Sequence, residues 1–401
     1  MIFEGKMKKF SFDYDKISAQ HGKDVADAVD YLYEIYHDGM YYWLAGLFDK
    51  ENGGIYYSNS ARDNDGYLAD IESTNQGLGL ARGLGVMREL NDLPPLISER
   101  TLAFAKSLED PDDGYFYHPQ WGKDISVGRK GRDLDSSIGV IRWLGGKPDY
   151  PTALDRITSN DKKDDGAIPP HLRSREAFLE YLENYDICTN SYPKGHNISS
   201  QRTQIAAAGL GDVCIDFINS LQRPDTALWE DKVDYESANG LLKISTLYPA
   251  FSREYPNALN AVKTEIAVTL SDEPVGGITD IYNPWIAFGI LLENIKTFGG
   301  EESYAEARQL IVDNTVAMIR KSKDKLAEFY KPDGSFSYFK KTSSPTSQGA
   351  PAAVPGSVEG DVNATALSNA TRAKILEILG IDTGKPFGEE DRAIFQSLIT
   401  P

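Results

Sequence analysis

Asp113-Gly114-Tyr115-Phe116 is one copy of a short loop that recurs along the chain. The loop reads Asp or Gly, then Gly, then one residue or none, then an aromatic or apolar residue. The other copies are Gly53-Gly54-Ile55-Tyr56, Asp165-Gly166-Ala167-Ile168, Gly276-Gly277-Ile278, Asp333-Gly334-Ser335-Phe336 and the degenerate Thr226-Ala227-Leu228-Trp229. Their central positions lie 60, 52, 61, 50 and 57 residues apart. A nearly constant period of this length predicts a repeat architecture with two secondary-structure elements in each repeat.

Apolar residues at helical spacing flank these loops, whereas the alternation typical of strands is scarce. The helices expected from this pattern are 22–49, 70–90, 96–108, 133–144, 151–158, 170–185, 199–222, 235–250, 256–270, 284–298, 302–330, 363–379 and 388–399. Residues 342–360 are rich in Ser, Pro, Gly and Ala and are expected to form a loop or lid. The sequence therefore predicts an all-α fold of about six helical hairpins.

Six helical hairpins can stack as an open solenoid or close as a double ring, and the glycine loops favour the ring. Glycine allows the chain to turn with positive φ, and the residue that follows it can act as a wedge between neighbouring hairpins. Ile55, Phe116, Ile168 and Phe336 are the expected wedges.

Helices joined by Asp-Gly-x-aromatic loops resemble the α/α-toroid superfamily, which includes terpenoid cyclases, protein prenyltransferases and the six-hairpin glycosidases and polysaccharide lyases. The segment from Gln222 to Trp229 resembles the Gln-to-Trp repeat of terpenoid cyclases, with Ala227 in place of its glycine. The resemblance covers about residues 25–380 and implies an (α/α)6 toroid. We therefore expect one domain with a repeat body over about 22–399. The loops are scaffold, so the resemblance does not fix an activity.

The composition narrows the classes of partner. The chain has 401 residues and a net charge of −18, without a Lys/Arg-rich run, which disfavours nucleic acid and anionic membranes as partners. No stretch reaches the length of a membrane span, and the first ten residues lack a signal-peptide core. Cys188 and Cys214 are expected to be free thiols of a cytoplasmic protein, or of a secreted one if a signal peptide was removed.

A second pattern follows most of the loops and opens the next helix. It reads Asp70-Ile71-Glu72-Ser73, Asp133-Leu134-Asp135-Ser136 and Asp234-Tyr235-Glu236-Ser237, with weaker copies at Asp280 and Asp361. Asp at such a position is a good N-cap, and acidic residues suit the helix dipole there. A cap explains one acid in each copy but not the second. Inner helices of a toroid would bring Glu72, Asp135 and Glu236 to one mouth, and paired carboxylates are what glycoside hydrolysis requires.

Aromatic residues gather in and after the same loops, where their faces suit sugar rings. The loop around residues 117–132 adds His and Arg side chains. The expected substrate-binding residues are Tyr57, Tyr117, His118, Trp121, Arg132, Tyr235, Tyr282 and Trp285.

These observations predict hydrolysis of an oligosaccharide by Glu72, Asp135 and Glu236 in acid and base roles. The first alternative is a lyase acting on an acidic sugar through Tyr117, His118 and Arg132. Further alternatives are a terpenoid cyclase, whose acidic motif is matched in letters by residues 110–113, and a non-catalytic binding scaffold. No nucleotide or metal cofactor is expected, because phosphate-binding and metal-ligand spacings are absent from the sequence.

Overall fold

The computed structural model describes residues 7–89, 92–159 and 168–401, and this part of the chain is all-α, as the sequence predicts. The helices are α1 (Tyr14–His21), α2 (Lys23–Tyr33), α3 (Gly39–Ala45), α4 (Asn59–Arg62), α5 (Ile71–Leu84), α6 (Pro95–Ser107), α7 (Val127–Trp143), α8 (Ala153–Ser159), η2 (Pro170–Leu172), α9 (Arg175–Glu183), α10 (Ser191–Ser199), α11 (Arg202–Ala207) and α12 (Gly211–Leu221). They continue with α13 (Tyr235–Ser245), α14 (Leu247–Ala250), α15 (Ala258–Leu270), α16 (Thr279–Asn294), η3 (Ile295–Gly299), α17 (Gly300–Leu326), α18 (Val362–Leu379) and α19 (Glu389–Ile399). Two short antiparallel strands, β1 (Thr346–Ser347) and β2 (Ala350–Pro351), form a hairpin inside the 342–360 segment.

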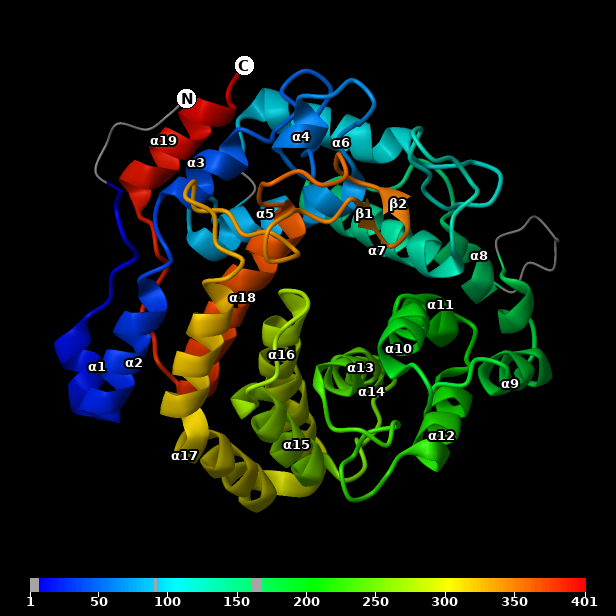
Figure 1. The fold of residues 1–401 in the computed structure, drawn as a ribbon. Helices are drawn as coiled ribbons and strands as arrows, with labels where there is room; N and C mark the ends of the chain where they lie inside the picture. Colours follow the sequence, from blue (N-terminus) through cyan, green and yellow to red (C-terminus); the bar gives the residue numbers. More distant parts are fainter. Residues whose placement is uncertain (1–6, 90–91, 160–167) are drawn as a thin grey trace.

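Six of the helices contact one another in a succession that returns to its start. Helix α5 packs against α7, α7 against α10, α10 against α13, α13 against α16, α16 against α18, and α18 against α5 (Figure 1). Other helices lie behind them: α6 packs against α7, α15 against α16 and α17, and α17 against α2. The last helix, α19, lies beside α3 near the beginning of the chain (Figure 1).

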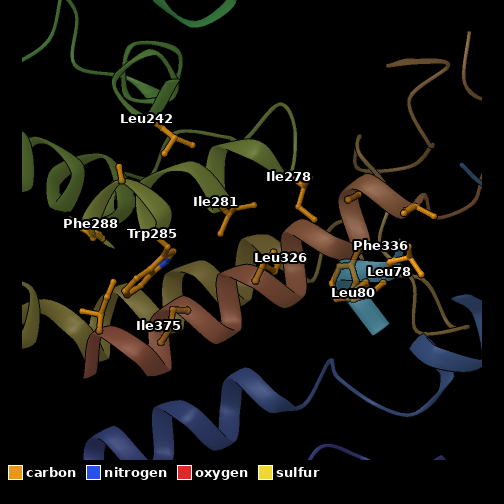
Figure 2. Packing of buried hydrophobic residues seen from close by; sticks show 14 of the residues in the cluster. Leu78, Leu80, Leu242, Ile278, Ile281, Trp285, Phe288, Leu326, Phe336 and Ile375 are labelled. Carbon is orange, nitrogen blue, oxygen red and sulfur yellow. The ribbon is translucent and has the colours of Figure 1, made fainter. Parts of the chain in front are cut away.

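The packing between these helices is apolar and dense. Figure 2 shows Trp285 and Phe288 of α16 directed into the core, with Ile375 of α18 and Leu326 of α17 nearby. Trp285, Phe288 and Leu326 are completely buried. Burying side chains of this size stabilises the fold by about 2–3 kcal/mol each before the loss of conformational entropy.

Aspartates cap three of the six helices as the sequence predicts. The carboxylates of Asp70, Asp234 and Asp361 accept hydrogen bonds from backbone N–H groups in the first turns of α5, α13 and α18. The prediction for Asp133 is wrong, because α7 begins at Val127 and is capped by Ser126. Asp133 lies inside the helix, where its carboxylate pairs with a guanidinium one turn earlier.

The glycine loops have the predicted backbone geometry at three of the copies. Gly54, Gly114 and Gly334 have φ of +90°, +73° and +89°. An added Cβ at Gly114 would lie 2.5 Å from a backbone oxygen before α8, so only glycine fits there. Gly277 is not among the residues with positive φ. The predicted loop at residues 165–167 lies outside the described residues.

The predicted wedges are confirmed in three of the four loops. Ile55, Phe116 and Phe336 are buried in the core, and the first of these closes on Gly77 of α5, where an added Cβ would lie 2.7 Å from its Cδ1. Ile168 is only partly buried.

Several helices expected from the sequence are interrupted, and one of them, 235–250, divides into α13 and α14 at Thr246. The longest of them, 22–49, divides into α2 and α3, because residues 8–10 pair with the backbone of residues 36–38 and take it out of the helix. Another, 199–222, divides into the end of α10, α11 and α12, with Gly209 at φ +70° between the last two. Helix α10 itself, which belongs to the succession of six, was not predicted.

Ala227 occupies the glycine position of the degenerate loop with φ of +59°. An alanine in this conformation is strained by about 1 kcal/mol because its Cβ approaches the following carbonyl. We therefore expect Ala227→Gly to raise the free energy of unfolding by about 0.5–1 kcal/mol, measured by urea denaturation. The matched control is Ala267→Gly, at an exposed position inside α15, which should lower it by about 1 kcal/mol. A loss of stability in both variants would contradict strain at Ala227.

Glu265 of α15 is a second destabilising feature. Its side chain is completely buried, and neither carboxylate oxygen has a hydrogen-bond partner in the described part of the chain. Burial raises its pKa well above the usual range, so the folded protein keeps this carboxyl protonated. An acid that binds its proton more tightly in the folded state makes stability fall as pH rises above the unfolded value of about 4.3.

We expect Glu265→Met to stabilise the protein by about 1–3 kcal/mol at pH 7, because it removes an unpaired polar group at similar volume. The gain should be smaller at pH 3, below the unfolded pKa of about 4.3, where the carboxyl is protonated in both states. Urea denaturation of both proteins at the two pH values measures the difference. An equal gain at both would show that the carboxyl does not carry the pH dependence.

Candidate active site

A cavity of about 980 Å³ lies among the six successive helices, at the end where the 342–360 segment crosses them. Its lining combines polar and apolar side chains and is uneven in charge. Basic residues come from α7, α10 and α13: Arg129, Arg132, His196 and Lys243. Tyrosines come from α10, α16 and two loops: Tyr185, Tyr192, Tyr282 and Tyr338. Amides come mainly from α5, α16 and α18: Asn75, Gln76, Asn197, Asn283, Gln348, Asn363 and Asn369. Of the residues that the structure describes, none that lines the cavity is Asp or Glu.

Arg129 is the central charge at the mouth of the cavity. Its side chain is only 1% exposed and faces three carboxylates, with Nη1 3.2 Å from Glu72 Oε2, Nε 2.9 Å from Asp133 Oδ1 and Nη2 3.7 Å from Asp70 Oδ1. Burial raises the pKa of Asp133 to about 7, although Arg129 opposes the shift. Arg129 also donates to the backbone oxygen of Ser347 at 2.9 Å, which fastens the strand hairpin to α7.

Glu72, expected to be catalytic, is buried beside the cavity and fully engaged. One oxygen accepts from Arg132, and the other lies near Arg129 and accepts from Ser347 Oγ at 2.8 Å. Burial alone would raise the pKa of Glu72, but Arg132, Arg129 and the Ser347 hydroxyl lower it to about 2. A carboxylate held in this way remains ionised and positions its neighbours.

The other two expected catalytic carboxylates do not line the cavity. Asp135, half-buried on α7, accepts from Thr203 Oγ1 at 2.9 Å and pairs with Arg202 at 3.3 Å, and burial raises its pKa. Glu236 is exposed in the first turn of α13. The expectation that the three surround one cavity is therefore not met, because Asp135 faces α11 and Glu236 faces solvent.

The expected substrate-binding residues are divided between the cavity and the core. Tyr282 and Arg132 line the cavity. Trp285 is a core residue whose Nε1 donates to Ser322 Oγ at 2.9 Å (Figure 2). Tyr57 is buried under the 342–360 segment with Ala352 and Ala353. The hydroxyl of Tyr235 accepts a hydrogen bond from Lys325 Nζ. These three residues were expected at the mouth because they follow the loops, but they face the interior.

The His118 loop supports the beginning of α5. His118 is 1% exposed; its Nδ1 accepts from the N–H of Gln120 at 3.2 Å, so Nε2 carries the proton and donates to Ala69 O at 2.9 Å. Burial lowers the pKa of His118, and Trp121 stacks on its ring at 4.0 Å. The Arg129 guanidinium lies over the Trp121 ring, with its Cζ 4.9 Å from the ring centroid. The hydroxyl of Tyr117 donates to Asp113 at 2.7 Å. None of these three expected residues lines the cavity.

Lys243 and His196 are the basic residues that the sequence analysis did not select. Among the described residues no hydrogen bond or ion pair reaches the Lys243 ammonium; its one neighbour of note is the Tyr192 ring at 5.8 Å. Burial and the nearby Arg132 lower the pKa of Lys243 to about 8. Burial, Lys243 and Arg132 lower the pKa of His196 to about 3, so its imidazole is neutral at physiological pH. The cavity thus holds an unpaired cation beside a neutral base.

A chain of amides fixes one acceptor in the cavity wall. Asp280 accepts from the N–H groups of Gly276 and Gly277 and from Asn239 Nδ2 at 2.7 Å. Because a carboxylate only accepts, Asn239 must receive the next hydrogen bond on its oxygen, from Asn283 Nδ2 at 2.7 Å. Asn283 is completely buried, and its Oδ1 remains without a partner among the described residues while the residue lines the cavity.

A sequence signal for this wall existed in the Asp-initiated helices. Asn75 and Asn239 each stand five residues after a capping Asp, Asn283 is the fifth residue of α16, and Asn363 lies in the first turn of α18. Asparagine is a poor residue for helix interiors, so its recurrence there indicates a polar inner face. Lys243 and His196 carry no such periodic mark.

Comparison of the chain with known protein families, curated proteins and solved structures found no match. Within residues 7–89, 92–159 and 168–401, no helix is long and apolar enough to cross a membrane. The same residues contain no cluster of three His, Cys, Asp or Glu side chains placed to hold a metal ion. Cys188 and Cys214 are both free thiols, as expected from the sequence.

We expect Glu72→Gln to destabilise the protein by about 3 kcal/mol at pH 7, because it removes the buried carboxylate that Arg129 and Arg132 share. The contribution of Glu72 is present above its unfolded pKa of about 4.3 and is lost as pH falls toward the folded value of about 2. The difference between the two proteins in urea denaturation should therefore shrink from pH 5 to pH 2.5.

Glu236→Gln is the matched control for this substitution. Glu236 has the same place after a capping Asp but is exposed. Its replacement should change stability by less than about 0.5 kcal/mol. Equal effects of the two substitutions would contradict the structural role of Glu72.

Proposed function

We propose that the protein is a carbohydrate-active enzyme that cleaves an acidic oligosaccharide by β-elimination in the 980 Å³ cavity. The observation that carries the proposal is the Lys243 ammonium, which has no partner among the described residues, beside the neutral imidazole of His196 and the Tyr282 hydroxyl. An unpaired cation in a partly buried polar cavity favours an anionic ligand. Tyrosine rings and amides suit the apolar faces and the hydroxyl groups of a sugar.

We also propose that the fold is an (α/α)6 toroid whose inner helices are α5, α7, α10, α13, α16 and α18. The closed succession of their contacts and the recurring glycine loops support this arrangement. A toroid explains why residues from six distant segments line one cavity.

The three groups can divide a β-elimination among them. Lys243 and Arg132 neutralise the sugar carboxylate and so acidify the neighbouring C–H. His196 takes that proton as the C–O bond to the leaving sugar breaks and a C=C bond forms. The sugar carboxylate offsets the charges of Lys243 and Arg132, two of the causes that lower the pKa of His196, and so makes the imidazole a stronger base when the substrate is bound. The Tyr282 hydroxyl gives its proton to the leaving oxygen. This hydroxyl forms no hydrogen bond with the described residues, so it is available to a substrate. Burial raises the pKa of Tyr282, which keeps it protonated as an acid.

The hydrolytic alternative has less support. Two carboxylates must flank the bond, one of them protonated. Glu72 is held ionised by two arginines, while Asp135 and Glu236 are absent from the lining. The lyase assignment keeps Arg132 from the sequence-based alternative and replaces Tyr117 and His118 by Tyr282 and His196.

The test is a product assay on neutral and uronic-acid oligosaccharides, read for new reducing ends and for the absorbance of a conjugated C=C bond. We expect both signals, and only from uronic-acid substrates. Reducing ends without the absorbance would establish a hydrolase instead. Silence in both channels across the panel would overturn the enzymatic proposal.

Variants assign the roles. Tyr282→Phe should lower kcat by about 100-fold or more with little change in KM, because it removes only the proton donor. Lys243→Met should raise KM at least about tenfold, and Lys243→Arg should recover part of the loss. Tyr304→Phe on α17, outside the lining, is the control and should leave both constants unchanged. Normal turnover by Tyr282→Phe would exclude that residue as the acid.

A further inference from the structure

The cavity has two chemically different walls. The basic wall consists of Arg129, Arg132, His196 and Lys243 on α7, α10 and α13. The amide wall consists of Asn75, Gln76, Asn283, Asn363 and Asn369 on α5, α16 and α18. No charged side chain of α5, α16 or α18 is among the described residues that line the cavity, so the two ends of a ligand would meet different chemistry.

We infer that the ligand is a mixed oligosaccharide, with an acidic sugar unit against the basic wall and an uncharged sugar unit against the amide wall. This inference rests on the proposed function and adds the composition of the substrate. The amide wall offers donors and acceptors but no charge to balance a second carboxylate.

The hydrogen bonds within the amide wall leave groups that suit neutral hydroxyls. Asn283 Oδ1 is a buried acceptor without a partner among the described residues, and the negative end of its dipole disfavours a carboxylate at this wall. Gln76 Nε2 donates to Asn363 Oδ1 at 3.2 Å and lies 3.4 Å from Glu72 Oε1, which leaves Gln76 Oε1 and Asn363 Nδ2 for a ligand. Each can bond a sugar hydroxyl, which is both donor and acceptor.

The amide wall is also kept open. Helix α5 contains Gly77, Gly79 and Gly83, although glycine in a helix interior is less stable than alanine. A Cβ added to Gly77 would lie 2.7 Å from Ile55, and one added to Gly83 would lie 2.6 Å from Asn369. Close packing therefore explains the glycines at these two positions. Gly79 lines the cavity with nothing within 4 Å of an added Cβ. A side chain there would extend into the space beside Gln76 and Asn363.

The test uses calorimetric binding of three probes: glucuronate, a disaccharide of two glucuronate units, and a disaccharide of one glucuronate and one glucose. We expect the mixed disaccharide to bind at least about tenfold more tightly than either of the others. A gain of this size corresponds to one or two additional hydrogen bonds between the uncharged sugar and the amide wall. Gly79→Leu should abolish that gain and leave glucuronate binding unchanged. The control Gly139→Leu, at an exposed glycine of α7 outside the lining with equally free space, should change neither.

The outcomes separate this inference from the proposed function. If glucuronate binds through Lys243, as tested with Lys243→Met, but both disaccharides bind equally, the two-wall inference is overturned and the proposed function stands. The same holds if Gly79→Leu leaves the affinity for the mixed disaccharide intact. If glucuronate does not bind, or binds independently of Lys243, both fail.

Discussion

The buried guanidinium of Arg129 is the charge on which the mouth of the cavity depends. It holds carboxylates of α5 and α7 and the backbone of the strand hairpin, so three segments far apart in sequence share one ion-pair network. A cation buried to this extent must be paired. That requirement places Glu72 and Asp133 in the network and removes Glu72 from the set of free acids. The second arginine on Glu72, Arg132, is left on the cavity side, where it sets the positive potential felt by Lys243 and His196.

The same network explains why the protein combines a net charge of −18 with a basic cavity. The acidic residues lie elsewhere, many of them on the surface, in helix caps or in the Arg129 network, while the described residues of the lining include none. The overall charge of a chain therefore says little about the charge of its site. A ligand enters a local field set by three or four side chains within a Debye length, and the surface charge is screened beyond about 10 Å.

The scaffold was more predictable from sequence than the site. Glycine loops, their apolar wedges and three of the Asp caps follow local rules, because positive φ and unpaired N–H groups restrict the residue at each position. Asp133 has the spacing of a helix cap but lies inside α7, where its carboxylate pairs with the buried Arg129 one turn earlier. Helix α10 was missed since Ser191 to Ser199 carries Pro, Gly and His without a strong apolar period. Lys243 and His196 were missed because only tertiary packing makes one an unpaired cation and the other a neutral base.

A cavity lined by six segments places a particular demand on its walls. Each of these helices presents one face to its neighbours and another to the cavity, and on α5 and α18 most of the residues on the cavity face are small or carry an amide. Asn239 and Asn283 illustrate this, since their hydrogen bonds connect α13 to Asp280 of α16 while Asn283 also lines the cavity. The hydrogen bonds that join the helices thereby orient the groups available to a ligand. Substituting Asn239 would alter the wall through Asn283 without touching the ligand, so scaffold and specificity share the same residues here.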